Sequence, residues 1–161
     1  MDAAADIVGL DAAPGLADAI ADRYHAQWSR DPSPAARERA REEVRESLDE
    51  RSLPITRVAV RGGALAGAAQ LKIREMARYP AFEWWLGGVF VEPAHRGSGL
   101  ASRLVRACID EAGRRGLPRL HLQTERADGG LYARLGWRTV ERIRDDGLEK
   151  TIMVREVVDG A

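Results

Sequence analysis

The sequence predicts an α/β fold with a mixed sheet, and three observations lead to this fold class. Apolar side chains recur every four positions in three segments, which is typical of amphipathic helices. Short apolar runs separated by turn signals indicate strands in the remainder. Strand and helix segments follow one another along 161 residues, a length that suits a single hydrophobic core. One domain of layered helices and strands is therefore expected.

The first fifty residues predict a short strand and two helices. The strand spans residues 6–10. The first helix lies within residues 13–28, where the apolar positions four apart are Leu16, Ile20, Tyr24 and Trp28. The second helix lies within residues 31–50, which begin with capping residues and a proline at a plausible first turn. Mixed charges cover most of this second helix, as on a solvated face.

From Pro54 onward the pattern changes to strands around one long helix. The expected elements are, in order, strands at 54–60, 64–73 and 83–91, a helix at 97–116, a strand at 119–124, a short helix at 129–137, and strands at 137–143 and 149–158. The first two of these strands flank an Arg-Gly-Gly turn and predict a hairpin. The order indicates antiparallel strands early and late, with a β-α-β crossover in the middle.

Composition and charge exclude several classes of function. Lysine plus arginine equals aspartate plus glutamate at 25 each, so no net field would attract nucleic acid or an anionic membrane. No apolar run approaches the roughly 18 residues that span a bilayer, and the N-terminus lacks the basic region of a secretory signal. One cysteine, Cys108, excludes an intrachain disulfide, and three scattered histidines give no metal-ligand spacing. A cytoplasmic protein without a metal is expected.

A glycine-rich loop joins the third strand to the long helix. It consists of Arg96, Gly97, Ser98 and Gly99, followed directly by Leu100 and Ala101. Such a loop presents unpaired backbone N–H groups at the positive end of a helix dipole, where they bind phosphate without a basic side chain. The same residues also fit a plain turn. The loop lacks the Gly-Lys-Ser/Thr of a Walker loop and does not match Gly-x-Gly-x-x-Gly.

Two motifs in the right order and separation carry a family resemblance. The spacing Arg96-x-x-Gly99-x-Ala101, after "VFVEP" and before an amphipathic helix, resembles the pyrophosphate loop of the GNAT superfamily of acyl-CoA-dependent N-acyltransferases. The segment "LYARLGW" is similar to the superfamily's Leu-Tyr-x-x-x-Gly-Phe segment. The resemblance covers nearly the whole chain and implies one domain, residues 1–161. It implies about seven strands in a mixed sheet, splayed at the middle, with about four helices on its two faces.

The resemblance also implies acetyl-CoA as co-substrate. In this superfamily the pantetheine arm enters between two central strands that part at their ends. The residues carried over as coenzyme-binding are Val89, Phe90 and Val91 for the arm, Arg96, Gly97, Ser98, Gly99, Leu100 and Ala101 for the pyrophosphate, Tyr132 facing the sulfur, and Glu125 at the position of an asparagine that contacts the pantetheine or orders the loop. The pair Gly87-Gly88 suits a bulge that would help to part the strands. The alternative is a regular strand that contains two glycines by chance.

The implied reaction is direct attack of a primary amine on the thioester, which requires proton transfers. An alkyl ammonium with a reference pKa of about 10.4 must lose a proton before it attacks. Tyr132 matches the superfamily tyrosine that faces the coenzyme sulfur and is the expected acid, although packing alone would also explain it.

Glu83 is the expected base, because its offset from the loop matches the catalytic glutamate of the histone-acetylating branch. A water chain is the alternative, and Glu92, Glu125 and Asp128 are rivals. Glu125 and Asp128 stand where the superfamily often has asparagine and alanine.

The acceptor is expected to enter opposite the coenzyme through an aromatic mouth. Trp28, Trp84 and Trp85 would line this mouth and, with carboxylates, would suit a cationic amine. The same tryptophans also fit roles as core or edge anchors, and His25 fits a structural role. The expected partner is a small-molecule or peptide amine, with neither nucleic acid nor a membrane. A homodimer is common in the superfamily, but no patch in the sequence indicates one.

Two other functions remain as alternatives. One is a non-catalytic acyl-CoA-binding sensor or partner module with the same fold. The other is a phosphate-loop protein for a different nucleotide, which the missing Lys-Ser/Thr disfavours. Thiol release from acetyl-CoA with a panel of amines separates an enzyme from a binding module, and binding of ATP in place of acetyl-CoA would support the last alternative.

Overall fold

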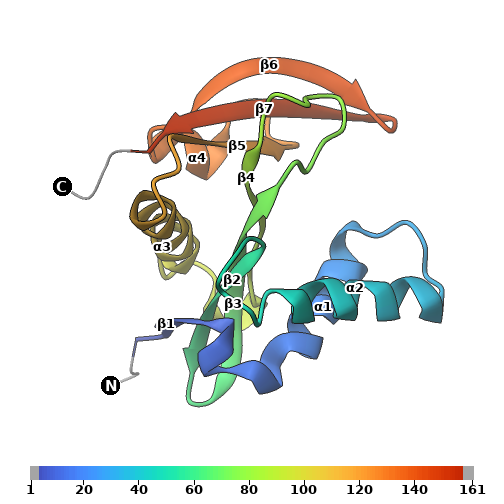
Figure 1. Cartoon of the computed structure of the whole chain (residues 1–161), viewed down its shortest axis with the longest axis vertical. Helices are drawn as coiled ribbons and strands as arrows, with labels where there is room; N and C mark the ends of the chain where they lie inside the picture. Colours follow the sequence, from blue (N-terminus) through green and yellow to red (C-terminus); the bar gives the residue numbers. More distant parts are fainter. Residues whose placement is uncertain (1–3, 158–161) are drawn as a thin grey trace.

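A seven-stranded sheet with four α-helices makes up the computed structural model, which describes residues 4–157 (Figure 1). The strands are β1 (Asp6–Gly9), β2 (Ile55–Arg61), β3 (Ala64–Ile73), β4 (Trp84–Val91), β5 (Arg119–Thr124), β6 (Arg138–Asp145) and β7 (Leu148–Glu156). The helices are α1 (Ala17–Trp28), α2 (Pro34–Glu46), α3 (Leu100–Arg114) and α4 (Gly130–Arg134). The order across the sheet is β1-β2-β3-β4-β5-β7-β6, and only the β4–β5 pair is parallel.

The predicted fold class, element order and mixed sheet are confirmed, and the expected elements differ from the observed ones mainly at their ends. One such difference lies at the start of α3, which begins at Leu100 and leaves the glycine loop outside the helix. Gly97 and Gly99 both have φ of +78°, a left-handed conformation that a right-handed helix does not contain. Val158, at the end of the expected last strand, lies outside the described residues.

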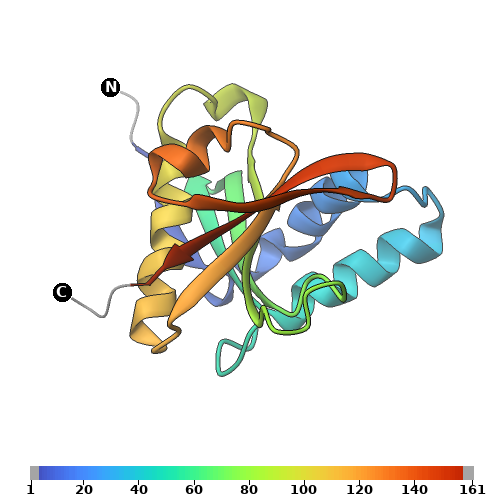
Figure 2. The same ribbon diagram turned by 90° about the horizontal axis from the view of Figure 1, so that it is seen from above.

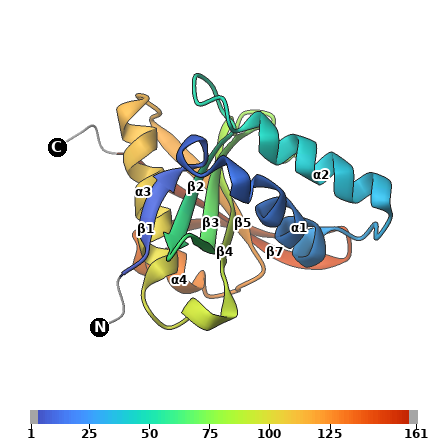
Figure 3. The ribbon, with the colours of Figure 1, turned by 90° about the horizontal axis from the view of Figure 1, so that it is seen from below.

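Helices cover both faces of the sheet. Figures 2 and 3 show α1 and α2 on one side of the strands and α3 on the other. The side of α3 that faces the sheet carries Leu104, Val105 and Cys108, all fully buried. Burial raises the pKa of Cys108 to about 12, so its thiol is a packing group. None of the helices in residues 4–157 has the length and apolarity that spanning a bilayer would require.

Ion pairs fasten α2 to α1. Arg37 and Arg41 both donate to the carboxylate of Asp22, with Nη2–Oδ2 distances of 2.7 and 2.9 Å. These two guanidinium groups hold the pKa of Asp22 far below its usual range. Arg45 and Asp18 form a further pair between the same helices. The charges on α2 therefore do more than face solvent, because they fix a helix that forms one wall of the cavity described below.

The central strands β4 and β5 touch at one place. Among the described residues their register contains the single pair Trp85 and His121, whereas β5 pairs with β7 along its whole length. Beyond that pair the two strands part, and Figure 1 shows β5, β6 and β7 turned steeply away from β1–β4. The predicted splaying of the sheet is confirmed.

A β-bulge accompanies this parting. The register between β3 and β4 shifts between Ala68 and Gln70, so Gly88 and Val89 together face one residue of β3. Gly88 has φ of +59°, and a Cβ on it would lie 2.7 Å from the Tyr24 phenol. Glycine is therefore required here both by conformation and by space, and the predicted bulge is confirmed.

Aromatic side chains hold the joint where β4 meets β5. The His121 ring stacks on Phe82 with 3.7 Å between ring centroids, and Trp85 packs beside both. The indole N–H of Trp85 donates to the carbonyl oxygen of Phe82 at 2.7 Å. Trp85 is fully buried in this joint and presents no surface to an acceptor.

Replacement of His121 by phenylalanine is expected to reduce the loss of stability at acid pH. Burial, with Arg119 as a second cause, lowers the pKa of the His121 imidazole to about 4, whereas an unfolded histidine titrates near 6.5. Between these values the unfolded chain holds a proton that the folded chain does not, so stability falls as pH drops from about 6.5 to 4. Urea unfolding at pH 7 and pH 4.5 should show a difference smaller by roughly 2 kcal/mol in His121→Phe. An equal difference in both proteins would contradict this role of His121.

Candidate active site

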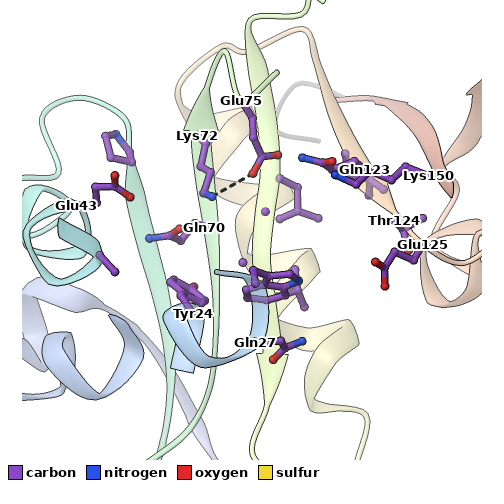
Figure 4. Close-up of a pocket in the computed structure, with 18 of the residues that line it drawn as sticks. Tyr24, Gln27, Glu43, Gln70, Lys72, Glu75, Gln123, Thr124, Glu125 and Lys150 are labelled. Atoms are coloured by element: carbon purple, nitrogen blue, oxygen red, sulfur yellow. Dashed lines mark hydrogen bonds and ion pairs between the residues drawn. The ribbon is translucent and has the colours of Figure 1, made fainter. Parts of the chain in front are cut away.

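A cavity of about 1160 Å³ opens where β4 and β5 part. One wall comes from α1 and α2, and the other from the ends of β5 and β7 with the turn after β6. Figure 4 shows side chains reaching it from both sides of β4, with Tyr24, Gln70 and Lys72 on one side and Gln123, Glu125 and Lys150 on the other. The cavity therefore spans the two halves of the sheet.

Glu75 lies against β4 at Gly87, the residue that precedes the bulge. It follows the end of β3, and its Oε1 accepts a hydrogen bond from Lys72 Nζ at 3.0 Å. The same Oε1 lies 3.0 Å from the position of a Cβ on Gly87, so the carboxylate rests against the backbone of β4. Figure 4 shows this ion pair as a dashed line beside the strand. Glu75 is half-buried, whereas the other carboxylates that line the cavity are exposed.

Three buried polar atoms of the cavity wall lack hydrogen-bond partners within residues 4–157. They are Oη of Tyr24, Oε2 of Glu75 and Oε1 of Gln123, and these three residues are called the polar floor below. The Gln123 amide oxygen accepts hydrogen bonds, and so does the Glu75 oxygen when its carboxyl group is ionised. The Tyr24 phenol can accept or donate. Burial raises the pKa of Tyr24 well above its usual value, so the phenol stays neutral. Buried polar atoms without partners are rare in native proteins, so a ligand or ordered water in the cavity would complete the hydrogen bonding of the polar floor.

Among the charged side chains that the structure describes around the polar floor, the cations have ion-pair partners and three of the carboxylates do not. Each cation of the cavity wall forms an ion pair within the chain: Arg30 with Asp146, Lys72 with Glu75, Arg126 with Asp128, and Lys150 with Asp145. Three carboxylates of the wall, Glu43, Glu46 and Glu125, have no such partner in the described part of the chain. These three residues are called the acidic rim below.

Tyr132 lies on α4 and lines the cavity from the side opposite α1. Its ring contacts Trp137 edge-on, with 6.2 Å between centroids. Burial raises the pKa of Tyr132 to about 12, so the phenol keeps its proton throughout the physiological range. A protonated phenol beside the parted strands is able to donate a proton to a group held there.

The glycine loop places free backbone donors at the N-terminus of α3. The backbone N–H groups of residues 97–102 donate to no acceptor in the described part of the chain, and residues 96–99 are exposed. A Cβ on Gly97 or Gly99 would meet nothing within 4 Å, so these glycines serve the positive φ and not close packing. The arrangement matches an anion site at the start of a helix of fifteen residues.

Between this loop and the cavity, the side of β4 that faces β5 has no strand partner among the described residues, and the carbonyl oxygen of Val91 accepts a hydrogen bond from Arg96 Nε at 3.1 Å. The N–H of Glu92 donates to Ala66 of β3 at 2.8 Å. Because successive residues of a strand point their backbone groups in opposite directions, the N–H of Val91 points away from β3, toward the gap left by β5. An extended polar chain could pair with this edge.

Residues 15–137 match the sequence pattern of the Acetyltransferase (GNAT) family. The chain belongs to this family. The two motifs noted in the sequence, the glycine loop and the Leu-Tyr segment, both lie within the matched residues. A search of curated proteins finds no significant match to this acetyltransferase.

Solved structures of similar proteins share the fold of this acetyltransferase. An aminoglycoside 6'-acetyltransferase type Ii is 20% identical with a TM-score of 0.72, over 97% of this chain and 99% of that one. The protein yncA of Salmonella typhimurium, solved with its cofactor acetyl-CoA, is 22% identical with a TM-score of 0.71, over 99% and 97%. The ribosomal-protein-S18-alanine N-acetyltransferase of Escherichia coli is 21% identical with a TM-score of 0.66, over 98% and 96%.

The structure brings some of the expected site residues together and leaves others apart. Val89, Glu125, Tyr132 and Trp28 line the cavity of the acetyltransferase, and Trp28 remains 51% exposed at its edge. The expected base does not line it, because Glu83 binds Arg74 at 3.1 Å outside the cavity.

The other expected residues have structural partners. Trp84 packs against the main hydrophobic core, and Trp85 is buried in a separate, smaller cluster. Glu92 binds Arg23, His25 binds the backbone of Asp31, and Asp128 accepts a hydrogen bond from the backbone N–H of Gly130. In residues 4–157 no group of three or more histidine, cysteine, aspartate or glutamate side chains is arranged to hold a metal ion.

Three residues of the site were not singled out from the sequence as functional. In the sequence, Tyr24 belongs to an apolar helix stripe, and neither Glu75 nor Gln123 belongs to any motif. The signal for Glu75 was weak: a lone carboxylate after a strand, in a connection whose path the sequence does not specify. The signal for Gln123 was a polar residue near the end of a buried strand, which is also common without a function.

Proposed function

We propose that this acetyltransferase moves the acetyl group of acetyl-CoA to a primary amine by direct attack in a ternary complex. The observation that supports it most is the cavity itself. It lies at the parting of β4 and β5, with a protonated phenol, Tyr132, and a half-buried carboxylate, Glu75, both in its wall. A donor and an acceptor of protons thus share the space in which an amine would meet a thioester.

The coenzyme would be held by main chain more than by side chains. The free N–H groups of residues 97–101 suit the pyrophosphate, with Arg96 adding positive charge from the exposed loop. Val89, Phe90 and Val91 would flank the pantetheine arm, which can pair with the open edge of β4. Similar structures were solved with coenzyme A or acetyl-CoA, which is consistent with this arrangement.

The two proton transfers have different donors and acceptors. The carboxylate of Glu75 takes a proton from the bound ammonium, and the free amine attacks the carbonyl carbon of the thioester. The C–S bond breaks, and the departing sulfur receives the proton of Tyr132. The nitrogen, positively charged after the attack, gives its second proton to the Tyr132 phenolate, and Glu75 releases the first proton to solvent, so that amide, free coenzyme A and the starting enzyme result. Glu83 is the weaker candidate for the base, because Arg74 holds its carboxylate outside the cavity.

Replacement of Gly99 by alanine is expected to weaken the binding of coenzyme A by about tenfold. Alanine is strained at a φ of +78°, so the loop must change shape and its N–H groups lose their common direction. Gly116 is a matched control, since it has φ of +72° at the other end of α3 and equally open space. Calorimetry should show weaker binding in Gly99→Ala alone, although both variants lose about 1 kcal/mol of stability. Unchanged affinity in Gly99→Ala would remove the loop from the coenzyme site.

A non-catalytic coenzyme-binding module is the competing function, and thiol release from acetyl-CoA distinguishes the two. The purified protein is incubated with acetyl-CoA and a panel of amines, and free coenzyme A is measured by thiol titration. Amine-dependent release supports the enzyme. Tight coenzyme binding without release from any amine would favour the binding module.

A further inference from the structure

We propose that the acceptor is a dication, a primary amine that carries a second ammonium group a few bonds away. The inference rests on the proposed acetyl transfer and specifies the chemical class of its acceptor. Its two recognition elements are the polar floor, which receives the reacting amine, and the acidic rim, which receives the second charge.

The polar floor calls for a ligand that donates hydrogen bonds. Glu75 Oε2 and Gln123 Oε1 are buried acceptors without donors among the described residues, and Tyr24 Oη in the same cavity wall can also accept. An ammonium group carries three N–H donors and no acceptor, so it can donate hydrogen bonds to acceptor oxygens of this kind. A hydroxyl or a carboxylate would satisfy fewer of them. The reacting nitrogen therefore fits at the polar floor, next to the carboxylate that is proposed to deprotonate it.

The acidic rim calls for positive charge outside the floor. Glu43 and Glu46 are three residues apart on α2, so they share one face of the helix, and Glu125 lies across the cavity at the end of β5. None of them is paired within the described part of the chain, whereas every cation of the wall already is. The cavity thus offers unpaired negative charge and no unpaired positive charge.

This balance discriminates among amines. A zwitterionic amine such as an amino acid would bring its carboxylate toward the acidic rim, where no free cation receives it. A simple monoamine would fill the floor and leave the rim solvated. A compact diamine, which carries two positive charges at neutral pH, places one charge at each element. Charge complementarity therefore favours the diamine in binding and in the rate of encounter.

The test compares three amines of similar length: 1,5-diaminopentane, 1-aminopentane and 5-aminopentanoate. With saturating acetyl-CoA, kcat/KM from thiol release is expected to be about tenfold higher for the diamine than for the monoamine, and lowest for the zwitterion. The double variant Glu43→Gln/Glu46→Gln should reduce the advantage of the diamine to about twofold, because the diamine loses the partners of its second charge and so loses more than the monoamine does. Glu42→Gln removes one negative charge from an exposed position of α2 outside the cavity and should leave the advantage of the diamine unchanged.

Each outcome bears on one of the two claims. Similar kcat/KM for diamine and monoamine would overturn the dication proposal and leave acetyl transfer standing. A diamine advantage that survives in the double variant would overturn the assigned role of Glu43 and Glu46, and with it the proposed recognition of the second charge. Coenzyme binding without thiol release from any amine would overturn the proposed function, and the dication proposal with it.

Discussion

Glu75→Gln is expected to lower kcat at pH 7 by about 100- to 1,000-fold, the range typical of a lost general base. The amide keeps the shape of the side chain but cannot accept the proton of an alkyl ammonium. Because a free amine needs no base, the loss should shrink as pH rises toward the pKa of the acceptor, near 10. Steady-state thiol release between pH 6.5 and 9.5 measures this recovery. Binding of coenzyme A should be unchanged.

Glu83→Gln is the matched control for this experiment. Both carboxylates lie beside the β3–β4 connection and pair with a cation near the end of β3, Glu75 with Lys72 and Glu83 with Arg74. Both substitutions therefore break one ion pair, but only Glu75 faces the cavity. Glu83→Gln should keep kcat within about twofold of the wild type, since exposed ion pairs contribute little. A large loss in Glu83→Gln with normal turnover in Glu75→Gln would exchange the two assignments.

Tyr132→Phe is expected to lower kcat by about 100-fold with little change in the affinity for coenzyme A. The phenol hydroxyl makes no hydrogen bond to the described part of the chain, so phenylalanine preserves the packing against Trp137. What it removes is the proton for the departing sulfur. Since the pKa of Tyr132 is about 12, loss of this proton should produce no fall in wild-type kcat below about pH 11.

The control for Tyr132→Phe is Tyr79→Phe. Tyr79 stacks on Phe82 and donates to Glu141, away from the cavity wall, so the same chemical change there should leave turnover intact. Calorimetry with coenzyme A and steady-state kinetics separate binding from chemistry. Wild-type turnover in Tyr132→Phe across the pH range would remove the assignment of this residue as the acid.

The features predicted well from the sequence are those that depend on short-range physics. The spacing of apolar side chains predicts the helices, and the glycines of the loop and bulge indicate backbone with positive φ. Gly88, Gly97 and Gly99 all adopt it. The family resemblance of the Leu-Tyr segment implies that Tyr132 lies near the site, and Tyr132 does line the cavity.

The features that the sequence did not predict depend on how distant segments fold over one another. Trp85 and Trp84 face opposite sides of β4, but alternation along a strand does not say that one side is an aromatic joint closed by Phe82 and His121. The connection between β3 and β4 bends so that Glu75 lies over Gly87 while Glu83 pairs with Arg74. Local propensity contains no information on that choice between two glutamates.

The single register pair between β4 and β5 has a mechanical consequence. Backbone hydrogen bonds between neighbouring strands resist their sliding past one another. Between β4 and β5 the register contains a single residue pair, so this resistance is small. The relative position of the two halves of the sheet therefore depends more on the packing of the rings of Phe82, Trp85 and His121 than on backbone hydrogen bonds. Substitutions at these rings are therefore expected to change the width of the cavity while the backbone pairing of the other strands stays intact.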